Sequence, residues 1–240
     1  MTLHPLLLTL LRLMRGACAW ALVGAALAQQ APAAAAGTVI TTEQVRAELL
    51  AHAPDGAEAG KTVWVGLQLT HKPQWHTYWK NSGDSGLPTE LTWTLPEGVS
   101  AGAIAWPLPR KIPIGNLANY GYEDTVLLPV PLTITPAYKP SLLSSGMELK
   151  LKANWLVCKL ECIPEEGSFV LTLPARSSLA NGAFDKALQS VPTPLKADRA
   201  GQVAIVDGRQ IQLAVHGLPA AWQGRNLDFF PETPEVIATA

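Results

Sequence analysis

Two cysteines stand close together in the second half of the chain. Cys158 and Cys162 are four positions apart within residues 154–165, and the 240-residue sequence holds one further cysteine, Cys18. We expect Cys18 to be removed with the N-terminal segment described below. The mature protein would then carry a single isolated thiol pair, which makes this pair the first candidate for chemistry.

The spacing allows the two thiols to meet. Positions i and i+4 fall on the same side of a strand or helix, so Cys158 and Cys162 can form a disulfide if residues 159–161 make a tight loop. Closing so short a loop removes on the order of 2 kcal/mol of unfolded-state entropy, less than closing a longer one. The short loop therefore favours thiol–disulfide exchange, and a purely structural bridge stays open as an alternative.

Exchange requires a thiolate and a sulfur that a partner can approach. Lys159 would favour the thiolate, whereas three nearby carboxylates would oppose it, namely Glu161, Glu165 and Glu166. The sequence alone therefore leaves the thiol pKa of both cysteines undetermined.

The same two thiolates could instead bind copper. Soft thiolate ligands suit Cu(I), but a copper site here needs a third ligand. The candidates elsewhere in the chain are His52, His71, His76, His216 and Met147. None of these residues forms a Cys/His cluster in the sequence, and a structural zinc site would want four ligands. We predict no cofactor and no metal site, with Cu(I) at Cys158 and Cys162 as the alternative.

Two other stretches contain residue types that could do chemistry. Glu123 and Asp124 are adjacent acids, although such a pair after a turn is usually a solvated edge. Residues 75–89 are rich in Trp and Tyr, and we interpret them as a packed corner in preference to a binding face. The same interpretation places most of five tryptophans in the core: Trp64, Trp75, Trp79, Trp93 and Trp106. The sequence shows no phosphate-binding glycine loop and no Gly-x-Ser-x-Gly nucleophile motif.

The elements around the cysteines are predicted to be strands. Runs that alternate apolar and polar residues lie at 45–49, 63–69, 91–95, 126–134, 147–157 and 169–173. The fifth run leads directly into Cys158 and the sixth follows Cys162, which implies a hairpin across the cysteine loop. With 20 Pro and 19 Gly spread between the runs, residues 38–176 are predicted to form an all-β, antiparallel β-sandwich.

Two details of this fold can be predicted. Pro129 and Pro131 lie in one strand and remove ladder donors, so we expect residues 126–134 at a sheet edge. One helix is expected in residues 178–190, within a connector at 177–200, because apolar residues recur there at helical spacing: Leu179, Ala183, Ala187 and Leu188.

The chain starts a new pattern after the connector. Alternating runs at 203–206 and 211–215 flank Asp207-Gly208, which is a strong hairpin signal. Only about forty residues remain, too few for an independent domain. We therefore interpret residues 201–240 as an incomplete second β module, either the front of a longer chain or a module cut short.

The N-terminus predicts export. Arg12 and Arg15 precede an apolar run, and residues 26–28 (Ala-Leu-Ala) form a small-x-small cleavage site, so residues 1–28 are predicted to be a cleaved signal peptide. An uncleaved anchor and lipidation at Cys18 are the alternatives. An Ala/Pro linker follows at residues 29–37. No later stretch is long and apolar enough to span a membrane, so we expect an exported protein in a compartment that permits disulfides.

The composition and net charge narrow the classes of partner that the protein could bind. Hydrophobic residues make up 48% of the chain, enough for a packed core. Eighteen Lys and Arg against nineteen Asp and Glu give a net charge of −1. Because no basic stripe is present to neutralise phosphates, nucleic acid is not expected as a partner.

Four motifs in order carry a family resemblance. They are residues 75–89 (WHTYWKNSGDSGLPT), 104–107 (IAWP), 120–123 (YGYE) and 155–165, which holds both cysteines. Together they resemble the N-terminal periplasmic domain of the DsbD-type thiol:disulfide interchange proteins, closest to the branch associated with suppression of copper sensitivity. Residues 229–232 (FFPE) also look like a motif from the second periplasmic segment of that branch.

The resemblance implies a fold and a function. The fold would be an immunoglobulin-like sandwich. Its cysteine pair would accept electrons from a membrane-embedded domain, in the same longer chain or in a separate protein, and pass them to oxidised periplasmic, thioredoxin-like partners. The chain would act within a protein-disulfide reductase system, with links to copper tolerance and cytochrome c biogenesis. A copper-binding domain without redox catalysis is the alternative.

The resemblance also implies roles for residues. Cys158 and Cys162 match the redox pair, and Cys162 is expected to form the mixed disulfide. Residues 114–122 fall where the family has a cap loop over the pair, but the acidic residues and the phenylalanine of that loop are missing, and the cysteine spacing is shorter. The possible cap or supporting residues are Tyr120, Tyr122, Glu123, Trp155 and Lys159.

Overall fold

The computed structural model describes residues 37–140, 146–174, 179, 181–194, 201–206 and 210–237. The predicted signal peptide, all but the last residue of the predicted linker and the Asp207-Gly208 turn lie outside the described residues. Among the residues described, no helix is long and apolar enough to cross a membrane.

The described elements are mostly strands. In chain order they are β1 (Val39–Thr41), β2 (Val45–His52), β3 (Val63–His71), β4 (Thr77–Gly83), β5 (Glu90–Thr94), β6 (Val99–Ala101), β7 (Arg110–Ile114), β8 (Leu117–Tyr122), β9 (Thr125–Ile134), β10 (Met147–Cys158), β11 (Cys162–Leu173), the helix α2 (Gly182–Gln189), β12 (Gly201–Val206), β13 (Gln210–Val215) and the short 3-10 helix η1 (Ala220–Trp222).

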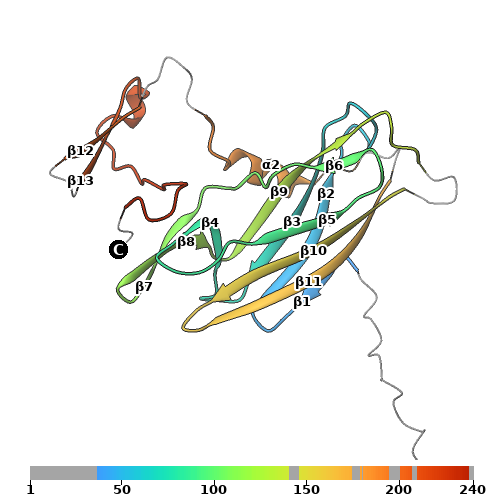
Figure 1. Cartoon of the computed structure of the whole chain (residues 1–240), viewed down its shortest axis with the longest axis horizontal. Helices are drawn as coiled ribbons and strands as arrows, with labels where there is room; N and C mark the ends of the chain where they lie inside the picture. The colour runs from blue at the N-terminus through green and yellow to red at the C-terminus, as the bar shows by residue number, and fades with distance from the viewer. Residues whose placement is uncertain are drawn as a thin grey trace, which may run out of the picture. The chain divides into compact units, whose positions relative to one another are not determined.

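Two antiparallel sheets make the sandwich (Figure 1). The larger has the strand order β1-β2-β3-β9-β6, and the smaller has the order β11-β10-β5. A core of buried side chains from β2, β3, β9, β10 and β11 fills the space between them. A third sheet, β4-β8-β7, adds Trp79, Tyr120 and Tyr122 to the same core. The predicted all-β antiparallel sandwich is confirmed.

The period-two alternation is why these residues form strands. In β2, Val45, Ala47 and Leu49 are buried while the residues between them are half-buried, and β10 buries every second residue from Met147 to Val157. Each fully buried aliphatic side chain stabilises the fold by roughly 1.5–3 kcal/mol relative to an exposed one. The inward-facing residues that the sequence predicted for β2, β3 and β10 are confirmed.

The prediction that residues 126–134 lie at a sheet edge is wrong. β9 pairs with β3 on one side, and β6 pairs with its last residues on the other. The backbone N–H groups of Gly102 and Ala105 donate to the carbonyl oxygens of Pro131 and Pro129, at 2.9 and 2.8 Å. The backbone carbonyl groups of both prolines therefore point away from β3, toward the segment that holds Gly102 and Ala105. That segment only donates hydrogen bonds to the prolines, so the missing proline N–H groups interrupt no ladder.

The predicted helix exists but is shorter than expected. Asn181 caps α2 by accepting a hydrogen bond from the Ala183 N–H at 3.0 Å, and so fixes the start of the helix. Leu179 lies before the cap and pairs with Ala53 as an isolated β-bridge. Phe184, which the apolar pattern had missed, is fully buried in a small cluster with Leu127 of β9.

The C-terminal hairpin is also present. β12 and β13 pair antiparallel from Gly201 with Val215 to Val206 with Gln210. All residues of β12 and β13 are exposed or half-buried. Whether residues 201–240 belong to an incomplete second module stays a prediction.

His71 joins three elements near the cysteine end of the sandwich. Its Nδ1–H donates to the carbonyl of Asp124 in the turn between β8 and β9 (3.0 Å), so its Nε2 accepts from the hydroxyl of Thr77 in β4 (3.0 Å). Burial is the main cause that lowers the His71 pKa from 6.5 to about 4. The ring is therefore neutral and holds both hydrogen bonds at neutral pH.

This burial predicts a loss of stability in acid. Because the folded-state pKa lies below the ordinary value, the unfolded chain binds the proton more readily. The free energy of unfolding should therefore fall as pH drops from about 6.5 to about 4, by roughly 3 kcal/mol from this histidine. Denaturant unfolding across this range should show a flatter decline for His71→Asn than for a variant of the exposed His216, His216→Asn. Identical pH profiles for the two variants would contradict this account.

Candidate functional site

The cysteines lie at the tip of the β10–β11 hairpin. Cys158 and Cys162 are directly opposite each other in the antiparallel register and form a disulfide, with their Cα atoms 4.2 Å apart. The Lys159 N–H donates to the carbonyl of Glu161 at 3.0 Å and closes the three-residue turn. The predicted hairpin across the cysteine loop is confirmed.

The two cysteines differ in exposure. Cys158 is 3% exposed, whereas Cys162 is exposed, beside a turn whose Leu160 is 95% exposed. Thiol–disulfide exchange requires the attacking thiolate to reach one sulfur. An approaching thiolate would therefore reach Cys162 more readily than Cys158.

A strand of the third sheet lies against the hairpin. His76, just before β4, forms an isolated antiparallel bridge with Cys158, with N–H···O distances of 3.0 and 2.9 Å in the two directions. Opposite residues of an antiparallel pair place their side chains on the same face. The register therefore puts His76, Cys158 and Cys162 on one face, together with Tyr78, which lies two residues beyond His76.

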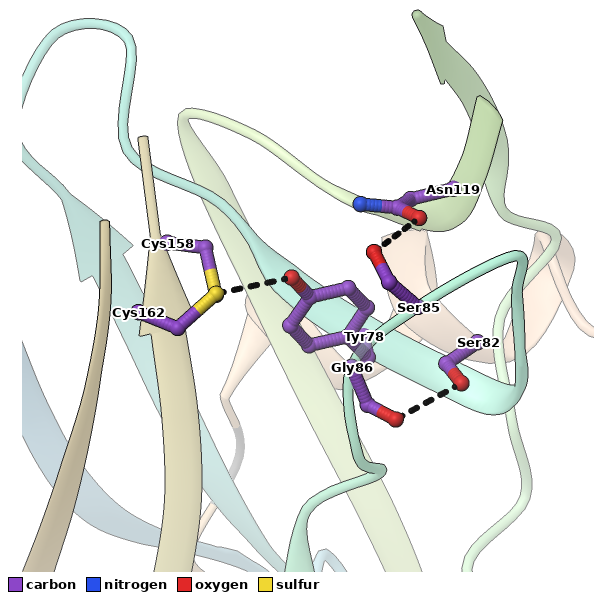
Figure 2. The surroundings of a disulfide bond; sticks show 7 residues. All are labelled: Tyr78, Ser82, Ser85, Gly86, Asn119, Cys158 and Cys162. Atoms are coloured by element: carbon purple, nitrogen blue, oxygen red, sulfur yellow. Dashed lines mark hydrogen bonds between the residues drawn. A yellow bond between two sulfur atoms is a disulfide. The ribbon is translucent and has the colours of Figure 1, made fainter. Parts of the chain in front are cut away.

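Tyr78 approaches the disulfide directly. Figure 2 shows its hydroxyl pointing at Cys162, and the oxygen lies 3.7 Å from the Cys162 Sγ. Because a disulfide sulfur carries no hydrogen, the hydroxyl is the donor. Burial raises the pKa of Tyr78 to about 12, so the phenol keeps its proton and remains a donor at neutral pH.

The turn after β4 holds the Tyr78 ring in place (Figure 2). The ring is 1% exposed, and a Cβ added at Gly86 would lie 2.2 Å from two of its carbons. Ser82 donates to the Gly86 carbonyl at 3.0 Å, and Ser85 donates to the Asn119 side chain of β8 at 2.9 Å. Gly86 also has φ +97°, a left-handed conformation that favours glycine. The turn therefore fits closely only because residue 86 lacks a side chain.

His76 is the second polar side chain beside the disulfide. It is 1% exposed and packs edge-on against Tyr78, with ring centroids 5.2 Å apart. Burial lowers its pKa from the usual 6.5, so the imidazole is neutral at neutral pH. Its Nε2 has no hydrogen-bond partner among the described residues.

Two of the predicted supporting residues lie in or next to the hairpin. Trp155 is 3% exposed and donates from Nε1 to the Glu165 carboxylate across the hairpin at 2.8 Å. Lys159 follows Cys158 in the turn, as the sequence requires. A groove of about 370 Å³ lies on this side and is lined by Leu87, Pro88, Glu90, Asn154, Trp155, Leu156, Pro164, Glu165 and Glu166.

The three predicted cap residues lie in β8 and just after it. The Tyr120 ring packs against Trp79 and Phe230, and the buried Tyr122 hydroxyl donates to the Pro107 carbonyl at 2.7 Å. Glu123 lines a separate pocket with Arg110. Their role as a cap stays a prediction, whereas the group that contacts Cys162 is Tyr78, which the sequence interpretation did not single out. The dense aromatic stretch at 75–89 was the signal that could have found it.

The candidate copper ligands are distributed over the fold. His76 lies beside Cys158, but His52 accepts a hydrogen bond from the Asn181 N–H, and Met147 begins β10, the strand that ends at Cys158. Within the described ranges, no group of three or more His, Cys, Asp or Glu side chains is arranged to hold a metal ion.

The fold and the site define a class of protein. A hairpin disulfide between an exposed cysteine and a buried one, with a protonated phenol beside it, is an arrangement suited to thiol–disulfide exchange. A family profile described as "Thiol:disulfide interchange protein DsbD, N-terminal" matches residues 46–174, more than half of the chain. The chain therefore belongs to the family of DsbD N-terminal domains, and the resemblance predicted from the four motifs is confirmed.

A solved structure supports the fold assignment. The N-terminal periplasmic domain of ScsB from Proteus mirabilis is similar with a TM-score of 0.51 and 20% sequence identity, covering 74% of this chain and 67% of that one. At this identity the likeness shows the fold, and the predicted immunoglobulin-like sandwich is confirmed. A comparison with curated proteins finds no match.

The fit between Gly86 and Tyr78 can be tested with two alanine variants. Gly86→Ala and Gly115→Ala both place alanine at a positive φ, but residue 115 has open space around its Cβ. We expect Gly115→Ala to cost about 1–2 kcal/mol from backbone strain alone, and Gly86→Ala a further 1–3 kcal/mol or so, because the Tyr78 ring must move. Denaturant unfolding of the oxidised protein measures both, and equal losses would refute the packing described for Tyr78.

Proposed function

We propose that this protein is a periplasmic thiol:disulfide exchange module. It takes electrons from a membrane-embedded reductase domain, in the same longer chain or in a separate protein, and reduces disulfides of periplasmic thioredoxin-like partners. The observation that carries the proposal is the disulfide between an exposed Cys162 and a buried Cys158. Family membership and the predicted signal peptide support it.

The first half-reaction loads the module with electrons. A thiolate of the donor attacks the Cys162 Sγ, the Cys158–Cys162 bond breaks, and Cys158 leaves as a thiolate that takes up a proton. The second donor thiolate then attacks the donor sulfur of the mixed disulfide and releases Cys162. The donor ends as a disulfide and the module as a dithiol, so two electrons and two protons have moved.

The second half-reaction passes the electrons on. The Cys162 thiolate attacks a disulfide of the partner, and one partner sulfur leaves as a thiolate. Cys158 then attacks the Cys162 Sγ, which restores the hairpin disulfide and releases the second partner thiolate. The burial of Cys158 supports a mixed disulfide at Cys162 in both halves.

Tyr78 supports the chemistry as a hydrogen-bond donor. A phenol that donates to a thiolate favours the charged form and so lowers the thiol pKa. The Tyr78 hydroxyl is already 3.7 Å from the Cys162 Sγ in the disulfide form. It can therefore stabilise the Cys162 thiolate without a large rearrangement when the bond to Cys158 breaks.

Removal of Cys158 should trap the mixed disulfide. In Cys158→Ala, the Cys162 thiolate can attack a partner disulfide but nothing in the module resolves the product. We expect a covalent complex with an oxidised thioredoxin-like partner, seen as a reducible shift on a non-reducing gel. Cys162→Ala, which keeps only the buried thiol, is the matched control and should form little complex. Equal trapping by both variants, or none by either with any thioredoxin-like partner, would count against the proposal.

Removal of the Tyr78 hydroxyl should slow exchange. In Tyr78→Phe the Cys162 thiolate loses a hydrogen bond that we set at about 1 kcal/mol, which corresponds to about a fivefold lower rate at neutral pH. The rate of mixed-disulfide formation with a small disulfide measures the effect. Tyr138→Phe, in the segment after β9, is the control and should keep the full rate; an unchanged rate for Tyr78→Phe would remove Tyr78 from the mechanism.

A further inference from the structure

A segment near the C-terminal end packs on the third sheet. The Phe230 ring meets Tyr120 of β8 and Trp79 of β4 edge-on, with centroid distances of 5.1 and 6.3 Å. Trp79 and Tyr120 also meet edge-on, at 6.4 Å, so the three rings form one cluster. Such edge-to-face pairs are favourable beyond the apolar area that they bury. Phe230 is thereby joined to the main core of the sandwich.

Polar contacts fix the same segment to β4. The Asn81 side chain, 3% exposed, donates from Nδ2 to the carbonyl oxygens of Pro231 and Thr233, at 2.8 and 3.4 Å. Lys80 forms an ion pair with Glu232 at 2.5 Å. That pair is partly exposed and adds little strength, but the amide of Asn81 is buried, so its hydrogen bonds must be satisfied in place.

These contacts fall where β4 is otherwise weakly held. β4 pairs with β8 at Thr77 and Tyr78 and again at Gly83, and the register shifts between Tyr78 and Gly83. The residues that hold the C-terminal segment, Trp79 to Asn81, lie within this irregular stretch. Asn81 also accepts a hydrogen bond from the Gly83 N–H at 3.1 Å, so one side chain joins the segment to the turn that holds the Tyr78 ring.

We propose that residues 230–233 act as a brace that keeps β4 in place and thereby positions the Tyr78 hydroxyl at Cys162. Phe230 and Asn81 are positioning residues, since they contact neither cysteine and act through the strand that carries Tyr78. The inference rests on the proposed function, because it assigns the brace to the exchange site. When the brace is released, β4 becomes more mobile next to Tyr78. The Tyr78 hydroxyl then no longer keeps its contact with the Cys162 Sγ, and the Cys162 thiolate is less stabilised.

The adjacent phenylalanines provide a matched test. Phe229 is 47% exposed, whereas Phe230 enters the ring cluster. We use the full chain with both Cys18 and Cys158 replaced by alanine, so that Cys162 is its single thiol, and measure the pH dependence of Cys162 alkylation by iodoacetamide. Phe230→Ala should raise the Cys162 thiol pKa by about half a unit to one unit and lower the alkylation rate about three- to tenfold below that pKa. Phe229→Ala should leave both unchanged. Equal behaviour of the two variants would overturn the brace.

Two further measurements separate positioning from loss of folding. Phe230→Leu keeps the apolar volume but loses the ring edges, so it should stay folded and give an intermediate shift in the thiol pKa. A synthetic peptide of residues 227–236, added to Phe230→Ala, should return the alkylation profile toward that of the background. A background-like profile for Phe230→Leu, or no effect of the peptide on a folded Phe230→Ala, would overturn the proposal.

The test is independent of any partner. Alkylation reports the Cys162 thiolate alone, so it gives an answer even if no periplasmic disulfide is reduced. Failure to trap a partner would refute the proposed function and leave the brace measurable, whereas an unshifted thiol pKa would refute the brace and leave exchange intact.

Discussion

The two backbone hydrogen bonds between His76 and Cys158 join the third sheet to the tip of the β10–β11 hairpin. β5 lies beside β10 from Lys150 to Asn154, and that pairing ends at Asn154. Beyond Asn154, β5 no longer pairs with this edge of β10, and the residues before β4 lie there instead. Because side chains of paired residues share a face, this one bridge brings the Tyr78 phenol and the His76 imidazole to the disulfide, and the chemistry of the site depends on it.

The sequence could predict what local pattern determines. Alternating apolar residues identify β2, β3 and β10 because a strand with one buried face repeats every two residues, and a strand that ends at Cys158 followed by one that begins at Cys162 makes a hairpin. The same logic failed for β9. Two prolines show that one side of the strand lacks backbone N–H donors, which suggests a sheet edge. The sequence pattern cannot show that Gly102 and Ala105 lie on that side and donate to the proline carbonyl groups. The boundary of α2 was missed for a similar reason, since the Asn181 cap decided its start.

The site was only half predictable. Cys158 and Cys162 are evident from their number and spacing, and the packed aromatic corner at residues 75–89 is largely confirmed by the burial of Tyr78 and Trp79. The position of Tyr78 follows from a bridge between residues 82 positions apart, which leaves no trace in local periodicity. The family's cap loop predicts a cap role for Tyr120 and Tyr122, whereas both rings lie in the core of the sandwich. The pairing of distant strands, rather than the residue type, determines that Tyr78 contacts the disulfide and that Tyr120 and Tyr122 do not lie beside it in the same way.

The unequal exposure of the two cysteines also bears on oxidative damage. A small oxidant such as a peroxide would reach the reduced pair at Cys162 first and convert that thiolate to a sulfenic acid. Cys158 lies directly opposite in the register, sheltered from the oxidant but within reach of the modified sulfur. Condensation of the two would expel water and restore the disulfide before irreversible oxidation to the sulfinic acid. Accidental oxidation of the reduced pair would thus end in the disulfide that the structure contains.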